Sequence, residues 1–236
     1  MELVRVFDLE PDLVADLDAH LAARLRRHVV VRAIDADRGV WAPERTFGAT
    51  APRGWLGVLV LDGLLTRSLK VSRHGCPALA GAGDLLRPWP EESGGAEVVW
   101  RVLSPARLAL LDDRFAAIAG RFPPVLARLL QRCATQAHDL AFHQALAGVR
   151  SADARMHLLL SHLAERWGRV TVDGVVLSLP LTHDLLGRLA YMRRPTATAA
   201  LGRLVRAGLV ARREDGAWVL PAAATVPEEP AARLAA

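Results

Sequence analysis

The sequence predicts an α+β protein: an N-terminal β-barrel or jelly roll, then a long helix, then a C-terminal winged helix-turn-helix. Short apolar runs divided by Gly, Pro and Asp clusters between residues 28 and 111 indicate the barrel. A heptad period after residue 123 indicates the long helix, and two short helical patterns with a following hairpin indicate the last part. With 236 residues, 52% of them hydrophobic, the chain can form one large or two modest domains.

The overall charge is weak evidence for a function. The chain has 30 Lys plus Arg against 25 Asp plus Glu, but Lys70 is the single lysine and asparagine is absent, which suggests the codon bias of a GC-rich genome. A phosphate-binding surface needs positive charge concentrated in one place, so the distribution of the arginines matters more than their number.

The sequence predicts a soluble, cytoplasmic protein without a membrane partner. Cys76 and Cys133 are too few for a disulfide framework and lack the CxxC spacing of a metal site. The N-terminus, MELVRVFDLEPD, lacks the basic and apolar regions of a signal peptide. The longest apolar stretch, residues 55–65, is much shorter than the ~20 residues of a membrane helix.

Residues 1–122 form the predicted barrel domain. Its first element is a helix over residues 11–27, which places Leu13, Leu17, Leu21 and Leu25 on one face. The following strands are HVVVRAI, WLGVLVL, LLTRSLKV, AEVVWRVL and RLALL. We expect turns at the Gly, Pro and Asp clusters between these strands, which are residues 52–54, 62–63 and 81–84.

A long helix is predicted over residues 123–149, after a short one at about 115–120. Steps of four and three residues form a heptad seam of Leu126, Leu130, Cys133, Ala137, Leu140 and Gln144. The seam could pair with the same helix of a second copy, or it could pack on the chain's own barrel. The heptad period is compatible with both alternatives. Cys133 on this seam is expected to be a small buried hydrophobe, with redox sensing as the alternative.

Residues 150–221 form the predicted winged domain. Ser151 is an expected N-cap for a helix that ends at Gly168, and a hairpin with its turn at Asp173-Gly174 follows. The last residues, 222–236, have no large apolar residue beyond Val226 and Leu234 and are expected to form a mobile tail.

The segment from Thr182 to Leu209 has the pattern of a helix-turn-helix. Thr182 is a good N-cap for the first helix, and Pro195 fits the first turn of the second, where a missing N–H costs nothing. The second helix has an apolar stripe of Ala197, Leu201, Leu204 and Val205. A hairpin around Asp215-Gly216 would form the wing.

Positive charge concentrates in this region. Residues 180–220 contain seven arginines against three acidic residues, a net charge of +4. The exposed face of the second helix would carry Arg194, Thr198 and Arg203, and arginines and hydroxyls suit guanine edges and phosphates. An ordinary helical hairpin with solvated arginines is the alternative, but it leaves the wing unexplained.

This order of elements resembles the Crp/Fnr family of bacterial transcription regulators, along nearly the whole chain. The segments that carry the resemblance are LTHDLLGRLAYMRRPTATAALGRLVRAGLV, WLGVLVLDGLL, GAGDLLRPW and HDLAFHQAL. The resemblance implies a cyclic-nucleotide-binding-like barrel, a homodimer joined by the long helix, and double-stranded DNA as a partner, with RNA polymerase as a further candidate. It also assigns Arg194 and Thr198 to bases, and Arg193, Thr196, Thr182, His183, Arg212 and Arg213 to phosphates.

The sequence departs from the family at three positions of this segment. Pro195 and Ala199 stand where many members have an acidic residue and a second arginine, so DNA shape could contribute more to specificity. Tyr191 occupies the turn position where glycine is common, and a positive φ there would strain it.

The effector is not predicted. Gly83, Asp84 and Arg87 are candidate ligand-binding residues, but the cassette that holds a cyclic nucleotide is missing, which disfavours that ligand. Two cysteines cannot hold an iron-sulfur cluster. Haem is not excluded as a cofactor, because a single histidine can serve as its protein ligand. The candidate ligands are His74, His138, His143, His157 and His162.

The sequence contains no GxSxG, HExxH, P-loop or GxGxxG motif, so an enzyme is not predicted. The second hypothesis is a ligand-binding sensory protein whose winged domain contacts other proteins.

Overall fold

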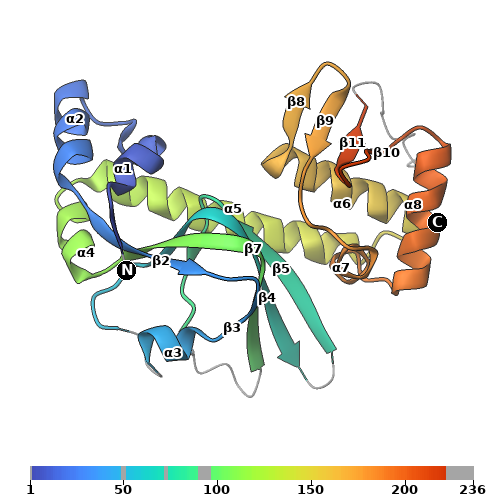
Figure 1. Cartoon of the computed structure of the whole chain (residues 1–236), viewed down its shortest axis with the longest axis horizontal. Coiled ribbons are helices and arrows are strands. Elements are labelled where there is room, and N and C mark those ends of the chain that lie inside the picture. Colours follow the sequence, from blue (N-terminus) through green and yellow to red (C-terminus); the bar gives the residue numbers. More distant parts are fainter. Residues whose placement is uncertain (1, 49–51, 72–73, 90–96, 222–236) are drawn as a thin grey trace, which may run out of the picture. The chain divides into compact units, whose positions relative to one another are not determined.

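A computed structural model describes residues 2–48, 52–71, 74–89 and 97–221 of the chain (Figure 1). The chain divides into two compact units, Met1–Leu140 and Ala141–Ala236. The tail predicted over residues 222–236 lies outside the described residues.

The first unit begins with short elements where the sequence predicts one helix over residues 11–27. The elements are β1 (Glu2–Val4), α1 (Val6–Leu9), the 3-10 helix η1 (Pro11–Val14) and α2 (Ala19–His28). The prediction of one continuous helix is wrong because Asp18 caps α2, its side chain accepting a hydrogen bond from the Leu21 N–H at 2.9 Å. The apolar spacing was still informative, since Leu13, Leu17, Leu21 and Leu25 all pack into one core.

An antiparallel sheet forms the centre of this unit. The strands are β2 (Val31–Ala36), β3 (Gly39–Trp41), β4 (Gly57–Val71), β5 (His74–Gly81), β6 (Leu85–Leu86) and β7 (Glu97–Leu111), and helix α3 (Pro43–Phe47) follows β3. The strand order is β1-β2-β7-β4-β5, with β3 paired to β7 and β6 to β4. Within the described ranges these pairings form a path with two ends, so closure into a barrel stays a prediction.

The strands β4 and β7 are longer than the sequence predicts. Asp62-Gly63 was expected to be a turn, but it lies inside β4, where the register with β7 shifts. Gly63 has φ +93°, and a Cβ atom there would lie 2.4 Å from the carbonyl oxygen of Pro105. Pro105 lies opposite this irregularity, where a strand tolerates a residue without an N–H donor. The predicted turn is therefore a bulge at which two long strands approach closely.

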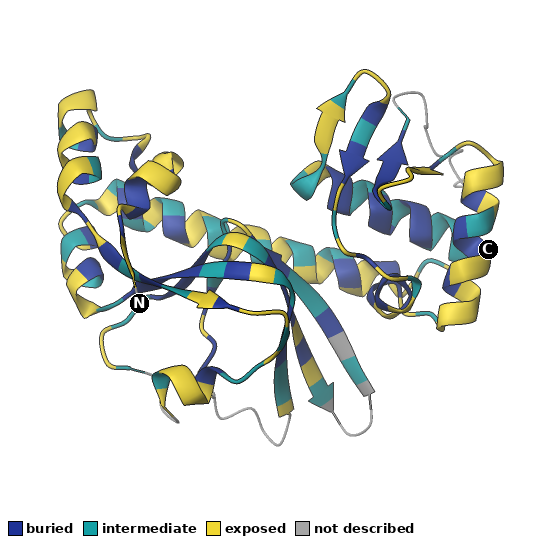
Figure 2. Ribbon diagram, viewed as in Figure 1, coloured by how far each residue is buried: buried dark blue, intermediate teal, exposed yellow. Residues whose placement is uncertain are grey.

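Two hydrophobic cores stabilise the first unit (Figure 2). One joins the N-terminal helices and α4 (Asp113–Ala119) to β1, β2 and the ends of β4 and β7, and includes Phe7, Leu59 and Phe115. The other lies on the opposite side of the sheet and includes Val58, Trp89 and Trp100. Helix α5 (Pro123–Leu146) starts in the first core, to which Val125 and Leu129 contribute.

The second unit contains α6 (Ala152–Trp167), β8 (Arg169–Thr171), β9 (Gly174–Leu177), α7 (His183–Leu189), α8 (Arg194–Arg206), β10 (Ala211–Arg212) and β11 (Trp218–Leu220). Ser151 caps α6 as predicted and accepts a hydrogen bond from the Ala154 N–H at 3.3 Å. The β8–β9 turn is displaced by one residue from the prediction, since Gly174 pairs with Thr171 and begins β9. The four strands form one antiparallel sheet in the order β10-β11-β9-β8.

Candidate nucleic-acid interface

Helices α7 and α8 form a helix-turn-helix with close packing between them. The Thr182 side chain caps α7 and accepts a hydrogen bond from the Leu185 N–H at 3.1 Å. Gly187 lies where the helices meet, and a Cβ atom there would be 2.9 Å from the Met192 carbonyl oxygen and 3.2 Å from the Ala197 Cβ. Pro195 lies in the first turn of α8 as predicted.

The turn between the helices is strained and is held by a side chain from α6. Tyr191 has φ 53°, so the positive φ considered from the sequence is present. Nη1 of Arg155 donates to the carbonyl oxygens of Ala190 and Tyr191, at 3.2 Å each. The Arg155 guanidinium also donates to the carbonyl oxygen of Val149, with Nε at 3.0 Å. One arginine therefore connects the helix-turn-helix turn to the segment before α6.

The outer face of α8 is exposed (Figure 2). Arg193, Arg194, Thr196 and Thr198 are all exposed, and no ion pair of Arg193 or Arg194 is present among the described residues. The inner face buries Ala197, Ala200, Leu201 and Leu204. The prediction that Val205 belongs to this buried stripe is wrong, because its position on the helix leaves it 43% exposed.

His183 connects α7 to α8 and to the wing formed by β10 and β11. Its Nδ1 atom lies 3.0 Å from Oγ1 of Thr198, and its Nε2 atom lies 3.4 Å from Nη1 of Arg212. The Arg212 guanidinium carbon lies 4.7 Å from the ring centre of Trp218, a cation–π contact. Partial burial lowers the pKa of His183, and the positive charges of Arg212 and Arg194 lower it further.

The remaining predicted arginines have acidic partners. Arg203 forms a two-pronged ion pair with Asp153 of α6, with both N–O distances 2.7 Å. Its guanidinium in turn lowers the pKa of the Asp153 carboxyl. Arg213 lies 3.4 Å from Asp215 in the wing turn. Both arginines lie on the surface of the unit that carries α8, and the guanidinium group of each is paired with a carboxylate.

Arg155, Asp153 and Trp218 also belong to this site, although no sequence pattern predicts them there. Arg155 and Asp153 lie on α6, far from α8 in the sequence, and no local pattern indicates their partners. The sequence could have suggested a role for Trp218, because it is a large aromatic residue on the predicted wing and arginines precede the wing turn.

Two of the three candidate ligand-binding residues of the first unit, Gly83 and Asp84, make contacts that hold the fold together. Asp84 is 1% exposed, and its carboxylate accepts a hydrogen bond from the Gly81 N–H at 2.8 Å. The Gly83 carbonyl oxygen accepts from Nη1 of Arg132 on α5 at 3.1 Å. Arg132 also forms an ion pair with Glu10 at 2.7 Å, so α5 is fastened to the turn before β6 and to the N-terminal segment.

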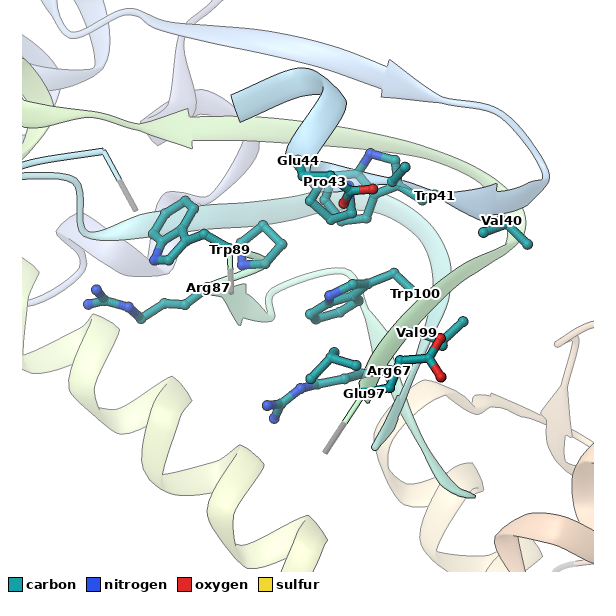
Figure 3. A pocket seen from close by; sticks show the side chains of 13 residues that line it. Val40, Trp41, Pro43, Glu44, Arg67, Arg87, Trp89, Glu97, Val99 and Trp100 are labelled. Carbon is teal, nitrogen blue, oxygen red and sulfur yellow. The ribbon is translucent and has the colours of Figure 1, made fainter. Parts of the chain in front are cut away.

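A cavity of about 390 Å³ lies elsewhere in the first unit (Figure 3). Trp41, Trp89 and Trp100 line it together with Arg67 and Arg87. The Arg87 guanidinium lies 5.6 Å from the Trp89 ring, the aromatic packing that its neighbours in the sequence suggest. Of the three candidate residues only Arg87 lines this cavity.

The predicted dimer seam faces outward from the single chain. Leu130 is 69% and Leu140 47% exposed, and Cys133, Ala137 and Gln144 are also exposed, while Leu126 is half-buried. Cys133 is exposed in the single chain, so its predicted burial would require a partner helix on the seam.

Two of the candidate haem histidines, His143 and His162, lie close together, with ring centres 6.0 Å apart. His138 is exposed, His143 and His157 are buried, and His162 stacks on Phe142 with ring centres 4.0 Å apart. The side chain of His74 lies outside the described part of the structure. Across the described residues, no group of three or more His, Cys, Asp or Glu side chains could hold a metal ion. None of the described helices combines the length and apolar character needed to cross a membrane.

Comparisons with known proteins agree with this architecture. Residues 154–223 match the family described as Crp-like helix-turn-helix domain. Among curated proteins no relative matches the sequence.

Solved structures of similar fold include several regulators. A mutant of CooA from Carboxydothermus hydrogenoformans has a TM-score of 0.61 at 17% identity, over 80% of this chain and 83% of that one. FixK2 from Bradyrhizobium japonicum has a TM-score of 0.60 at 20% identity, over 81% and 93%. A cyclic nucleotide-binding domain containing protein from Listeria monocytogenes EGD-e has a TM-score of 0.63 at 16% identity, over 92% and 97%.

These findings define the class of protein. The predicted α+β fold is confirmed: the chain has the fold of Crp/Fnr-type transcription regulators. Its C-terminal part is a Crp-like helix-turn-helix domain, which confirms the family resemblance seen in the sequence.

Proposed function

We propose that the chain is a sequence-specific DNA-binding transcription regulator that acts as a homodimer in the bacterial cytoplasm, without catalysing a reaction and with RNA polymerase as a further partner. The observation that carries this proposal is the exposed N-terminal face of α8, where Arg193, Arg194, Thr196 and Thr198 gather within a Crp-like helix-turn-helix. The N-terminal residues of such a helix contact base edges in the major groove, and surrounding cations contact phosphates.

Arg194 is the proposed principal base contact. It lies in the first turn of α8, is exposed and forms no ion pair within the described residues, so its guanidinium donors are available to a guanine edge. Arg193, Thr196, Thr182 and the arginines of the wing are proposed to contact phosphates.

The experiment measures binding of the full chain to a duplex that it selects from a randomised library. We expect Arg194→Ala to weaken binding roughly tenfold or more, since a good guanine contact contributes about 1–3 kcal/mol. The matched control is Arg24→Ala, which removes the same charge from the exposed surface of α2. Absence of binding to any duplex at low salt would overturn the proposal and favour a sensory protein whose winged domain contacts other proteins.

The homodimer is supported by the exposed seam of α5, because large apolar side chains at heptad spacing are expected to be covered by a partner helix. We expect Leu130→Glu to shift the full chain to a monomer in analytical ultracentrifugation. Leu3→Glu is the control, since Leu3 is 65% exposed on β1 and lies off the seam. A wild-type chain that sediments as a monomer at micromolar concentration would contradict the dimer.

A further inference from the structure

The cavity of the first unit combines aromatic walls with arginine side chains (Figure 3). It measures about 390 Å³, and Trp41, Trp89 and Trp100 line it together with Arg67 and Arg87. Sites for small molecules measure roughly 300–1,000 Å³ and are lined mainly by apolar and aromatic side chains, with a few polar groups that orient the ligand. The cavity therefore has the size and the kind of lining of a ligand site.

Three neighbouring strands place Trp41, Trp100 and Arg67 in one row. Trp41 of β3 pairs with Trp100 of β7, and Trp100 pairs with Arg67 of β4. Residues directly opposite each other project from the same face of a sheet. This face is apolar, because Trp100 and Leu65, two residues before Arg67 on the same strand, both belong to the second hydrophobic core. Arg67 thus projects from the core side of its strand.

The aromatic walls are held by their neighbours. The rings of Trp41 and Trp100 meet edge to face with centres 5.9 Å apart, and Phe47 makes edge contacts with Trp41 at 6.1 Å and Trp89 at 6.2 Å. Trp89 and Trp100 are 4% and 5% exposed. A ligand would therefore meet rings that are already in place, so little side-chain freedom is lost on binding.

The arginines of the cavity have no carboxylate partner. No ion pair of Arg67 or Arg87 is present in the described part of the chain, and both side chains are exposed, so their guanidinium groups can turn toward a ligand without breaking such a pair. Two glutamates also line the cavity, and Glu97 forms an ion pair with Lys70 at 3.3 Å. The remaining lining charges are the two arginines against Glu44, a net charge of +1.

We infer that this cavity binds a planar aromatic carboxylate, whose ring packs among the tryptophans and whose negative charge is neutralised by Arg67 and Arg87. The planar guanidinium group matches a carboxylate in geometry and stays charged. A single negative charge balances the net charge of +1, whereas a phosphate dianion exceeds it. Flat rings make the stacked and edge contacts with indole that a saturated ring cannot make.

The inference goes beyond the proposed function, since the site lies in the first unit and its occupancy is measured without DNA. The first test titrates the full chain with 2-naphthoate by isothermal titration calorimetry. 2-Naphthamide keeps the rings without the charge, and decalin-2-carboxylate keeps the charge without the flat rings. We expect 2-naphthoate to bind with a dissociation constant below about 1 mM and both analogues to bind several-fold more weakly.

Three results of this titration would overturn the inference. The first is no binding of 2-naphthoate at millimolar concentration. The second is equal binding of 2-naphthoate and either analogue, which would show that the charge or the flat ring is not recognised. The third is tighter binding of 2-naphthyl phosphate than of 2-naphthoate, which would assign the cavity to aromatic phosphates.

The second test locates the charge recognition. Arg67→Met and Arg87→Met should each weaken the binding of 2-naphthoate about tenfold, the effect of losing a hydrogen bond to a charged group. Both should leave the binding of 2-naphthamide nearly unchanged. The matched control is Arg101→Met, because Arg101 follows Trp100 in β7, is exposed and projects from the other face of the sheet. An equal loss in the control would overturn the assignment to these two arginines.

The third test locates the ring recognition. Trp41 is half-buried, and Trp41→Leu should weaken 2-naphthoate and 2-naphthamide by the same factor, because both lose the same aromatic contact. Melting temperatures of all variants show whether the fold is kept. Unchanged affinity in a folded Trp41→Leu would contradict the placement of the ring. A chain that binds duplex DNA but no naphthoate loses this site and keeps the proposed function, and the opposite result does the reverse.

Discussion

The guanidinium group of Arg155 donates a hydrogen bond to the carbonyl oxygen of Tyr191 across 3.2 Å, from α6 to the turn between α7 and α8. Tyr191 is the non-glycine residue of the described chain with a positive φ, at 53°. A strained turn and the side chain that holds it are thus 36 residues apart in sequence.

Tyr191→Gly should be more stable than Tyr191→Ala. The left-handed conformation costs a residue with a Cβ atom about 1–2 kcal/mol, and glycine loses roughly 0.5–1 kcal/mol through its freer unfolded state. Tyr191 is 39% exposed, and the contacts of its covered part are lost equally in both variants. We expect Tyr191→Gly to exceed Tyr191→Ala by about 0.5–1 kcal/mol in urea denaturation. Tyr191→Ala keeps the strain and should show no gain; equal effects of the two variants would exclude the backbone as the cause.

Arg155→Lys should destabilise the second unit although it keeps the charge. A lysine cannot reach the Val149 and Tyr191 carbonyl oxygens together, as the forked guanidinium does. Hydrogen bonds from a charged donor contribute about 1.5–3 kcal/mol, and at least one would be lost. The measurement is the melting temperature of the full chain together with DNA affinity. Unchanged values in both would show that the turn needs no support from α6.

Asp153→Asn should increase affinity for DNA. In the free chain Asp153 holds Arg203 by two contacts of 2.7 Å and competes with phosphate for it. Releasing Arg203 should steepen the dependence of the binding constant on salt by up to about 0.9 in log–log slope. The pair is exposed, so stability should change by less than about 1 kcal/mol. The effect should disappear when Arg203→Gln is also present; a gain that persists there would assign it to the lost negative charge alone.

Gly63→Ala should destabilise the first unit more than Gly39→Ala. Both glycines have positive φ, +93° and +139°, so both variants incur backbone strain. Only at Gly63 does the added Cβ atom meet other atoms, the Pro105 carbonyl oxygen at 2.4 Å and the Ala106 Cα at 2.5 Å. We expect the difference between the variants to be roughly 1–3 kcal/mol in urea denaturation, the usual cost of overpacking. Equal costs would mean that the bulge can open.

Stability should fall as pH falls, partly because of His157. Burial lowers its pKa below the ordinary 6.5, so the unfolded chain takes up the proton first. The contribution of the neutral ring is present above pH 6.5 and is lost as pH falls from there to the folded-state pKa. His183, whose pKa is also lowered, acts in the same direction.

The measurement is the free energy of unfolding between pH 7.5 and 5.5 at a fixed protein concentration. His157→Leu should reduce the slope with pH, whatever it does to stability at pH 7.5. A slope equal to that of the wild type would show that His157 is not the group responsible.

The sequence was most informative where a local pattern determines the structure. Ser151 and Thr182 cap the helices predicted for them, and the helix-turn-helix and wing follow from the spacing of apolar residues and the Asp215-Gly216 turn. Such features depend on neighbours within a few residues.

The errors arose where distant residues decide the outcome. Asp62-Gly63 has the composition of a turn, but the approach of Pro105 from β7 makes it a bulge. The supports of the candidate interface, Arg155 and Trp218, come from outside the recognition helix and its neighbours in sequence. The contacts of His183 with Thr198 and Arg212 join residues 15 and 29 positions apart, which no periodicity predicts.

The exposed seam of α5 has a consequence for regulation: if DNA binding requires a dimer, it depends on the concentration of the chain. If two copies must pair before each can place α8 on DNA, the concentration of competent regulator rises with the square of the chain concentration when pairing is weak. A modest change in synthesis or degradation would then produce a larger change in promoter occupancy. Leu130 and Leu140, remote from any base, would set the threshold at which this response begins.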